Sequence, residues 1–353
     1  MATTGSLITI DGGHGEGGGA LVRTALTMAA VTQQSVRIDN VRNGTNYPGL
    51  DIEDLTLLRA LAKVCAAESV GAEAGSKSVS FLPTRRSSGI KEAIDLDPSV
   101  QPNRTPNANV LLNALLPVMA QSGVYSRISL SGETYGSHSL CYDYFANVTL
   151  EAQKKFGLYA FPDLVTAGFG REGGGEVQIE IEPSALEAVD WSTPGELKAV
   201  RAVIAMGELP MTIAHRAISH LNNLASNAQL PMEAEISGVD SPRPGLCITV
   251  WAEFERGFGG STSMGAKGIR AEAVAQAAFE DVNSFVRSGA TVDPFLADQI
   301  LPTAILAEGQ TTFKVSRITK RFLTIVWVIK QFLPIHITVK GKEGEAGEVT
   351  VRR

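Results

Sequence analysis

The loop between Gly12 and Gly19 (GGHGEGGG) contains six glycines around a single carboxylate, Glu16. Glycine costs conformational entropy on folding, so a dense run is typical where the backbone takes positive φ values or presses against a neighbouring group. The residues that follow are apolar at helical spacing and carry Arg23 one turn into the helix. Backbone N–H groups at the start of that helix and the Arg23 guanidinium would converge on one point, which suits an anion such as a phosphate.

Two known phosphate-binding motifs do not describe this loop. No Gly-Lys-Ser/Thr sequence ends it, and its glycines are denser than those of a dinucleotide-binding fingerprint. Glycine-rich loops are also often plain tight turns, so the residues alone leave ligand binding and turn formation as alternatives. In the first alternative, Gly17, Gly18 and Gly19 are the candidate binding residues.

The elements that must position this loop alternate short strands with helices of about a dozen residues, which indicates an α/β or α+β protein. We expect strands at 6–10, 36–40, 78–82, 126–131 and 176–181, and helices at 20–32, 52–65, 109–122 and 141–156. A second glycine cluster at 168–176 echoes the first one and is consistent with recurring modules, although glycines alone are a weak repeat signal.

The pattern of polar and apolar residues changes after Pro183. A polar segment at 187–201 precedes expected strands at 202–207 and 247–253 and helices at 213–224 and 269–287, and a more apolar helical segment at 291–306 follows. This order predicts an insertion. The expected domains are a core made of 1–185 and 286–353 and an inserted α/β domain at 186–285.

The composition is that of an ordinary globular protein of 353 residues, with 44% hydrophobic residues, a net charge of −6 and a pI near 5.5. This acidic balance argues against a surface that coats nucleic acid, because such binding depends on neutralising phosphates, but it allows a local basic site. Three widely spaced cysteines in apolar surroundings, Cys65, Cys141 and Cys247, predict buried thiols in a reducing compartment. We therefore expect a cytoplasmic protein, or a nuclear one in a eukaryote. No leader pattern is visible, and the apolar run from Phe322 to Ile329 is too short to span a bilayer.

Several separated segments together resemble the RNA 3′-terminal phosphate cyclase family, in order and over nearly the whole chain. They are DGGHGEGGGALVR (11–23), VRNG (41–44) with PGL (48–50), GAEAGS (71–76), GGGE (173–176), GAKG (265–268) and LADQ (296–299). The resemblance implies a large domain of repeated βαβαββ modules, related in fold to enolpyruvate transferases and interrupted by a smaller α/β insert.

The resemblance also implies a reaction. Members of the family use ATP and a divalent metal, Mg²⁺ or Mn²⁺, to adenylate an active-site histidine. They then pass AMP to a 3′-terminal RNA phosphate, and the neighbouring 2′-hydroxyl displaces it to leave a 2′,3′-cyclic phosphate. A nucleophilic catalyst of this kind splits one difficult displacement into two easier ones.

By resemblance, Glu16 is the carboxylate near the metal and the ATP phosphates, and Arg23 and Arg42 are phosphate-binding cations. Asp298 and Gln299 are polar contacts in the nucleotide pocket. These roles make physical sense, because hard cations prefer carboxylate oxygens and phosphates suit bidentate guanidinium groups. Alternatives stay open: Asp298 and Gln299 could face solvent, and Arg42 could pair with Asp39 or Asp51.

The sequence departs from the family pattern at the reaction site. The nucleophilic histidine falls on Arg321, and arginine stays protonated with no free lone pair, so it cannot form the covalent phosphoramidate. Where the family pattern has a second loop arginine, this chain has Thr45, and where the pattern has a Gln-His pair, it has Glu53-Asp54. At position 295 the pattern has an aromatic residue that carries a hydroxyl, whereas Phe295 has none.

Among the five histidines, His14 is the candidate for a relocated nucleophile or base, because it lies two residues before Glu16. A bystander role is favoured, since a relocated nucleophile must preserve in-line geometry. His215 and His220 are five residues apart and do not share one helical face, so they predict no metal site.

Three functional hypotheses follow. The first is an ATP-dependent RNA-terminal phosphate cyclase or close variant, in which Arg23, Arg42, Arg321 and His14 are the candidate catalytic residues. The second is a noncatalytic RNA-binding or ribosome-assembly factor of the same fold. The third is an enzyme redirected to a small phosphorylated or carboxylated ligand, with Arg321 as a binding cation. We expect no membrane partner, and the oligomeric state is open, with a homodimer as one option.

Overall fold

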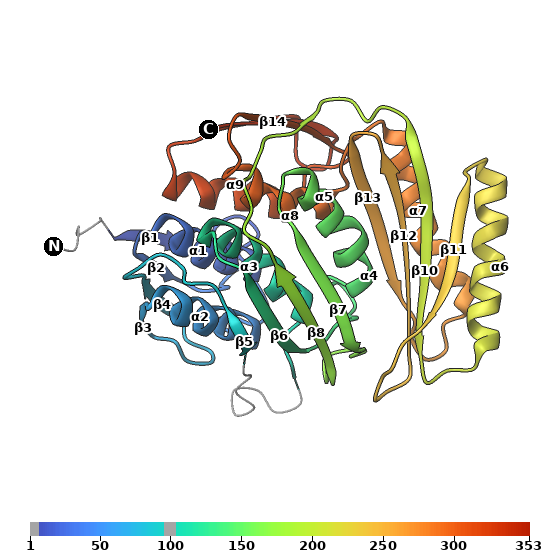
Figure 1. The fold of residues 1–353 in the computed structure, drawn as a ribbon, viewed down its shortest axis with the longest axis horizontal. Coiled ribbons are helices and arrows are strands. Elements are labelled where there is room, and N and C mark those ends of the chain that lie inside the picture. The colour runs from blue at the N-terminus through green and yellow to red at the C-terminus, as the bar shows by residue number, and fades with distance from the viewer. Residues whose placement is uncertain (1–6, 95–103) are drawn as a thin grey trace.

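This computed structural model describes residues 7–94 and 104–353. In that part of the chain, three of the four sheets repeat one topology (Figure 1). The first module consists of β1 (Ile8–Asp11), α1 (Gly19–Thr32), β2 (Val36–Asp39), α2 (Ile52–Cys65), β3 (Glu68–Val70) and β4 (Ser78–Leu82). Its strand order is β1-β2-β4-β3, with β1 and β2 parallel and the other pairs antiparallel.

The second and third modules follow the same plan. The second consists of β5 (Lys91–Ile94), α3 (Ala108–Ser122), β6 (Ser126–Gly132), the helical segment α4 (Tyr142–Tyr144), η1 (Phe145–Thr149) and α5 (Leu150–Lys155), β7 (Ala160–Thr166) and β8 (Gly175–Ile181). The third consists of β9 (Asp190–Trp191), α8 (Pro294–Ala304), β14 (Gln310–Val315), α9 (Lys320–Phe332), β15 (His336–Lys340) and β16 (Gly347–Arg352). The orders β5-β6-β8-β7 and β9-β14-β16-β15 match that of the first module. The expected repetition of βαβαββ modules is therefore confirmed.

The fourth sheet interrupts the third module between β9 and α8. It contains β10 (Leu197–Gly207), α6 (Met211–Ala228), β11 (Met232–Gly238), β12 (Gly245–Phe254), β13 (Gly257–Met264) and α7 (Ala271–Ser288), with strand order β11-β10-β12-β13. It has its own hydrophobic cluster, and Val292 bridges β13 to β14 of the third module. Figure 1 shows this unit at one end of the molecule, with α6 on the outside. The topology supports an insertion, while the boundaries 1–185, 186–285 and 286–353 stay a prediction.

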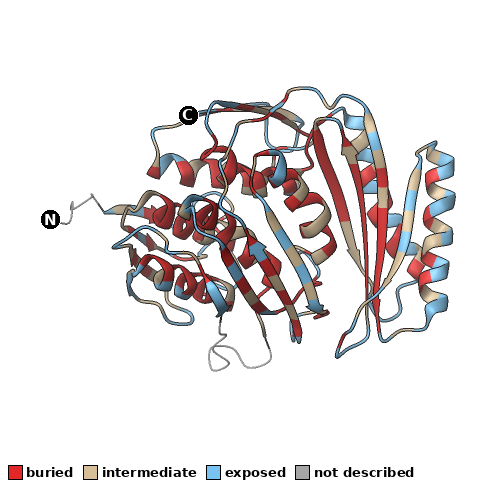
Figure 2. Cartoon of the chain, in the orientation of Figure 1, coloured by how far each residue is buried: buried red, intermediate tan, exposed pale blue. Residues whose placement is uncertain are grey.

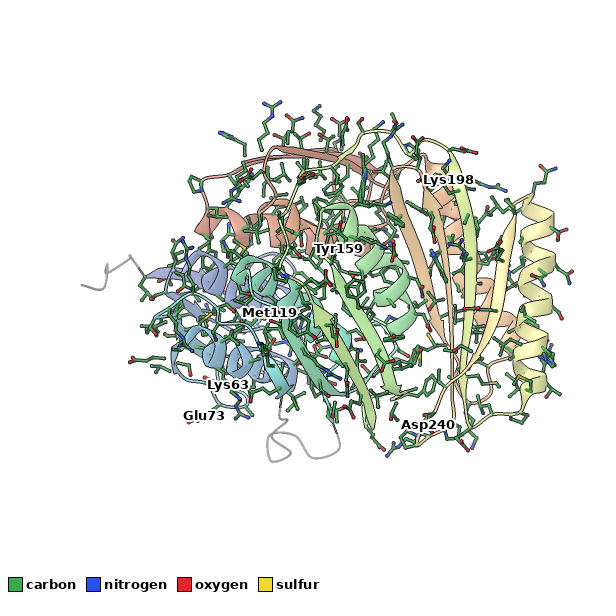
Figure 3. The ribbon with its side chains drawn as sticks, viewed as in Figure 1. Lys63, Glu73, Met119, Tyr159, Lys198 and Asp240 are labelled. Carbon is green, nitrogen blue, oxygen red and sulfur yellow. The ribbon has the colours of Figure 1, made fainter. Side chains whose placement is uncertain are left out.

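The hydrophobic core lies among the helices that the modules pack against one another. Helix α1 is apolar on nearly all sides, and Leu21, Leu26 and Met28 are at most 1% exposed. It packs against α2, α3 and α9, and Figure 2 shows mostly buried residues where these helices meet. In Figure 3, Met119 of α3 lies in this interior, whereas Lys63 and Lys198 lie at the periphery. The glycine loop thus precedes a helix that is packed into the core on nearly all sides.

Most expected elements are confirmed within one or two residues, and α2 and β4 match their expected ranges. The helix expected at 141–156 is confirmed within one residue as the continuous run of α4, η1 and α5, but the sequence did not predict the π-helical turn, η1, in its middle. Tyr144 and Thr149 bracket this turn, and both donate hydrogen bonds to residues of α8 or its cap. A π-turn changes the direction of side chains along a helix, which fits these two tertiary contacts. Residue 6 of the first expected strand lies outside the described residues.

Two further sequence expectations concern the thiols and membrane-spanning helices. Cys65, Cys141 and Cys247 are free and buried, as expected. Among the described residues, no helix combines the length and apolar character needed to cross a membrane.

Candidate functional site

A cavity of about 910 Å³ lies beside the glycine loop, where all three modules and the insert meet. The first module contributes Gly18, Gly19 and Arg23, and the insert contributes Ser261 and Asp281. Eight of the ten candidate site residues line it: Glu16, Gly18, Gly19, Arg23, Arg42, Asp298, Gln299 and Arg321. Residues nearly 300 positions apart in the sequence, such as Arg23 and Arg321, therefore line the same cavity.

The N-terminus of α1 has the geometry expected of an anion site. Gly18 is its N-cap, and no side chain bonds to the first backbone N–H groups. A Cβ atom on Gly19 would lie 2.6 Å from Arg23 Nη1 and 3.2 Å from Arg42 Nη2. Gly17 has a φ of +62°, a conformation that suits glycine. The glycines thus let two guanidinium groups approach the free end of the helix, as the sequence predicts.

Acidic side chains from the start of α2 share these two arginines. Arg42 forms ion pairs with Asp51 and with Asp54, the latter at 3.4 Å between Nη1 and Oδ2. Arg23 Nη1 lies 3.2 Å from Glu53 Oε2. Of the two partners considered for Arg42, Asp51 is thus the one observed. An incoming phosphate would have to compete with these carboxylates for the guanidinium N–H groups.

The two aspartates of this cluster form a capping box at the start of α2. Burial, reinforced by the nearby Asp51 carboxylate, raises the pKa of Asp54 to about 8. Burial also acts to raise the pKa of Asp51, but the Arg42 guanidinium outweighs it and holds that pKa below its usual value. The raised pKa of Asp54 and the lowered pKa of Asp51 place the negative charge that pairs with Arg42 mainly on Asp51.

Arg321 and Glu16 form a second charged pair on the cavity wall. The Nε atom of Arg321 lies 3.2 and 3.0 Å from the two Glu16 carboxylate oxygens, and Nη2 lies 3.0 Å from Oε1. This is a fork-to-fork arrangement, the strong geometry for a guanidinium and a carboxylate. The Glu16 backbone N–H also donates to Thr324 Oγ1 at 2.9 Å, so the loop is attached to α9 at two points.

Asp298 and Gln299 lie on α8, which begins at its N-cap, Asp293. Neither side chain simply faces solvent. The Oδ1 atom of Asp298 is buried without a hydrogen-bond partner, and burial raises the pKa of this carboxyl well above its usual range. Gln299 Oε1 accepts a hydrogen bond from Thr149. Asp298 therefore offers an unused polar atom beside the cavity, while Gln299 is already held.

The expected metal position does not fit these contacts. Both carboxylate oxygens of Glu16 accept hydrogen bonds from Arg321, and a divalent cation needs free oxygen ligands. Within 7–94 and 104–353, no group of three or more His, Cys, Asp or Glu side chains could hold a metal ion. The residues present thus do not fit a metal held at Glu16.

His14 lies on the other side of the loop. Its ring stacks on Trp327 of α9 with centroids 3.8 Å apart and planes 17° from parallel. It is exposed, and neither it nor Gly17 is among the residues that line the cavity. A chemical role for His14 stays a prediction, and its position supports packing between the loop and α9.

Sequence reasoning missed several charged residues that line the cavity, among them Arg104, Arg171 and Glu133. Arg171 follows Gly170 in the second glycine cluster, so the resemblance between the two clusters was the signal that could have found it. Arg104 Nη2 lies 3.6 Å from Asp51 Oδ2 and joins the first charged cluster. Nothing local to Arg104 in the sequence indicates this contact, because module packing creates it.

The chain resembles known proteins in sequence over nearly its whole length. A family model described as RNA 3′-terminal phosphate cyclase matches residues 14–339. The chain is 33% identical to the RNA 3′-terminal phosphate cyclase of Methanopyrus kandleri, covering 98% of this chain and 99% of that one. It is 35% identical to that of Pyrococcus furiosus, with the same coverage.

Among solved structures, the enolpyruvyl transferase NikO from Streptomyces tendae matches with a TM-score of 0.39 and 12% identity, over 99% of this chain and 48% of that one. The family model and the relatives extend over nearly the whole chain and include the segments that build the cavity. The chain belongs to the RNA 3′-terminal phosphate cyclase family.

Proposed function

We propose that this protein binds an adenine nucleotide and the phosphorylated 3′ end of RNA in the cavity, and that it does so without becoming adenylated at position 321. One observation carries the proposal: the Arg321 guanidinium lies in the cavity wall, paired with Glu16. A guanidinium stays protonated and has no lone pair with which to attack a phosphate. Binding is retained and the covalent step is lost.

The remaining wall supports binding of phosphate. The uncapped start of α1 presents backbone N–H groups, and Arg23 and Arg42 approach it through Gly19. Asp298 supplies a buried acceptor with no partner, which suits a donor such as an amino group of a base. These contacts support the nucleotide roles that the resemblance assigns to Arg23, Arg42 and Asp298.

The charge of the cavity supports a short ligand. The lining contains five arginines and five carboxylates: Arg23, Arg42, Arg104, Arg171 and Arg321, and Glu16, Glu53, Glu133, Asp281 and Asp298. A long nucleic acid gains affinity from many unpaired basic groups, whereas four of these five arginines already form ion pairs with acidic side chains. We therefore propose that the site takes the terminal nucleotide of an RNA, and a small phosphorylated ligand is the second candidate on the same observation.

The test follows labelled AMP and RNA ends together. The protein is incubated with α-labelled ATP, Mg²⁺ or Mn²⁺ and an RNA that ends in a 3′-phosphate, and protein-bound AMP and cyclic-phosphate ends are both measured. We expect no covalent adduct and no cyclic ends. An adduct would refute the proposal, and its loss in His14→Ala would identify His14 as a relocated nucleophile.

Binding is measured separately with fluorescent RNAs. We expect the 3′-phosphate RNA to bind about tenfold more tightly than the 3′-hydroxyl RNA, the equivalent of one charge-assisted hydrogen bond. Arg23→Gln should remove this preference. Arg317→Gln, which changes an exposed arginine outside the cavity lining, is the matched control and should retain it. Equal binding of both RNAs by the unmodified protein would favour the small phosphorylated ligand.

A further inference from the structure

We propose that Arg321 is the built-in cation of this phosphate site, so that the site binds the phosphates of its ligand without a divalent metal. The inference rests on the proposed function only in taking a phosphate-bearing ligand. It assigns a binding role to Arg321, the residue that cannot carry out the covalent step.

The contacts of Arg321 leave part of its guanidinium for a ligand. Its Nε and Nη2 atoms are those that bond to Glu16. A guanidinium has five N–H donors in a rigid fork, and the two N–H groups on Nη1 are outside this pairing. The Arg321 side chain is 42% exposed and lines the cavity. It can therefore hold Glu16 on one side and donate to a phosphate oxygen on the other.

The pair is held in position before any ligand arrives. Arg321 lies in the first turn of α9, whose N-cap, Thr319, accepts from the Phe322 backbone N–H at 3.0 Å. One turn later Thr324 donates to the Lys320 carbonyl oxygen at 2.8 Å and accepts from the Glu16 backbone N–H at 2.9 Å. The first two turns of α9 thus hold both the backbone of the glycine loop and the guanidinium that pairs with Glu16. Such preorganisation lowers the entropy that binding must overcome.

The arrangement of charge excludes a second cation at the same carboxylate. A metal on Glu16 would have to displace the hydrogen bonds that Arg321 donates to both carboxylate oxygens, and it would then lie close to a permanent positive charge. Arg23 and the free N–H groups of α1 border the same cavity and supply further positive potential. The protein itself therefore provides the positive groups that a bound metal would add.

Two measurements test this inference on the full chain. The first is calorimetric titration with ATP in EDTA and in MgCl₂. For the unmodified protein we expect dissociation constants in the two buffers that agree within about threefold, well below the effect of one charge-assisted contact. In Arg321→Gln, ATP binding in EDTA should weaken by about tenfold or more, and Mg²⁺ should restore part of it because Glu16 is released.

The second measurement is Mn²⁺ binding without nucleotide, followed by electron paramagnetic resonance. We expect Arg321→Gln to bind Mn²⁺ more tightly than the unmodified protein, and the double variant Glu16→Gln with Arg321→Gln to lose this gain. Arg317→Gln is the matched control, and circular dichroism checks that each variant is folded.

The outcomes separate this inference from the proposed function. A rise of tenfold or more in ATP affinity of the unmodified protein on adding Mg²⁺ would overturn the inference, and so would equal Mn²⁺ binding, or equal lack of binding, in the unmodified protein and Arg321→Gln. If ATP binds in neither buffer, nucleotide binding fails as a function, and the Mn²⁺ comparison still decides the role of Arg321.

Discussion

Replacing Asp293 should loosen the connection between the insert and the core. This carboxylate is 2% exposed and accepts four hydrogen bonds. Its Oδ1 atom accepts from the backbone N–H groups of Phe295 and Leu296 at 2.7 and 3.0 Å, which caps α8. Its Oδ2 atom accepts from the Tyr144 hydroxyl at 2.6 Å and the Gly260 N–H at 2.9 Å. One side chain thus joins the second module, the insert and the helix that carries Asp298.

The size of the effect follows from these four bonds. Loss of an N-cap costs about 1 kcal/mol, and each buried donor left without a partner costs about 1–3 kcal/mol. Because Asp293→Ala orphans two such donors, on Tyr144 and Gly260, we expect its free energy of unfolding to fall by about 5 kcal/mol. Asp293→Asn keeps an oxygen toward α8 but turns an amide nitrogen toward Gly260, so its loss should be about 2 kcal/mol.

Urea unfolding followed by tryptophan fluorescence measures both losses, with Trp191 and Trp251 as buried reporters at 4% exposure each. Asp163→Asn, on the exposed side of edge strand β7, is the control and should change stability by less than about 0.5 kcal/mol. Two results would contradict the reasoning. One is an Asp293→Ala protein within about 1 kcal/mol of the unmodified protein, since that is the size of the cap alone. The other is an equal loss in the Asn and Ala variants.

Three further predictions concern the cavity and the thiols. Gly19→Ala should weaken ATP or inorganic phosphate binding by about tenfold in calorimetry, because its Cβ would displace Arg23, whereas Gly238→Ala, whose Cβ meets nothing within 4 Å, should not. The raised pKa of Asp54, about 8, means that the fold favours the protonated acid, so its contribution to stability is lost as pH rises toward that value. The urea concentration at the unfolding midpoint should therefore decrease for the unmodified protein as the pH rises from about 5 to about 8, whereas for Asp54→Asn it should stay constant. The same pH dependence in both proteins would contradict the assignment to Asp54. A thiol reagent should modify none of the three buried cysteines, Cys65, Cys141 and Cys247, until urea unfolds the chain. Rapid labelling of the native protein would contradict their burial.

Local chemistry explains what the sequence could predict. The glycine loop, the helix after it and Arg23 lie within 12 residues, so spacing alone brings them to one point. For Arg42 the sequence offered two partners, Asp39 and Asp51. The structure selects Asp51, because Asp39 pairs with Arg37 on its own strand at 3.0 Å. For residues close in sequence, the possible contact partners could thus be narrowed to a few.

Long-range packing explains what the sequence could not predict. The ends of the π-turn η1 contact partners about 150 residues away, Asp293 and Gln299. Strand β9 has only two residues and exists because it pairs with β14. The pairing of Arg321 with Glu16 spans 305 residues. The family resemblance placed both residues at one site, but the sequence did not predict that their side chains form hydrogen bonds with each other.

The position of the insert also constrains the order in which the protein folds. Strand β9 must pair with β14, and the chain between them contains the whole inserted sheet with its own hydrophobic cluster. A disordered segment of that length makes loop closure entropically costly, whereas a folded insert brings its ends together. We therefore expect the insert to form before the third module closes, as nonlocal contacts generally form late. Arg321 and Asp298 belong to that module, so the cavity would be among the last features to assemble, and a kinetic trap in the insert would delay ligand binding without altering a single cavity residue.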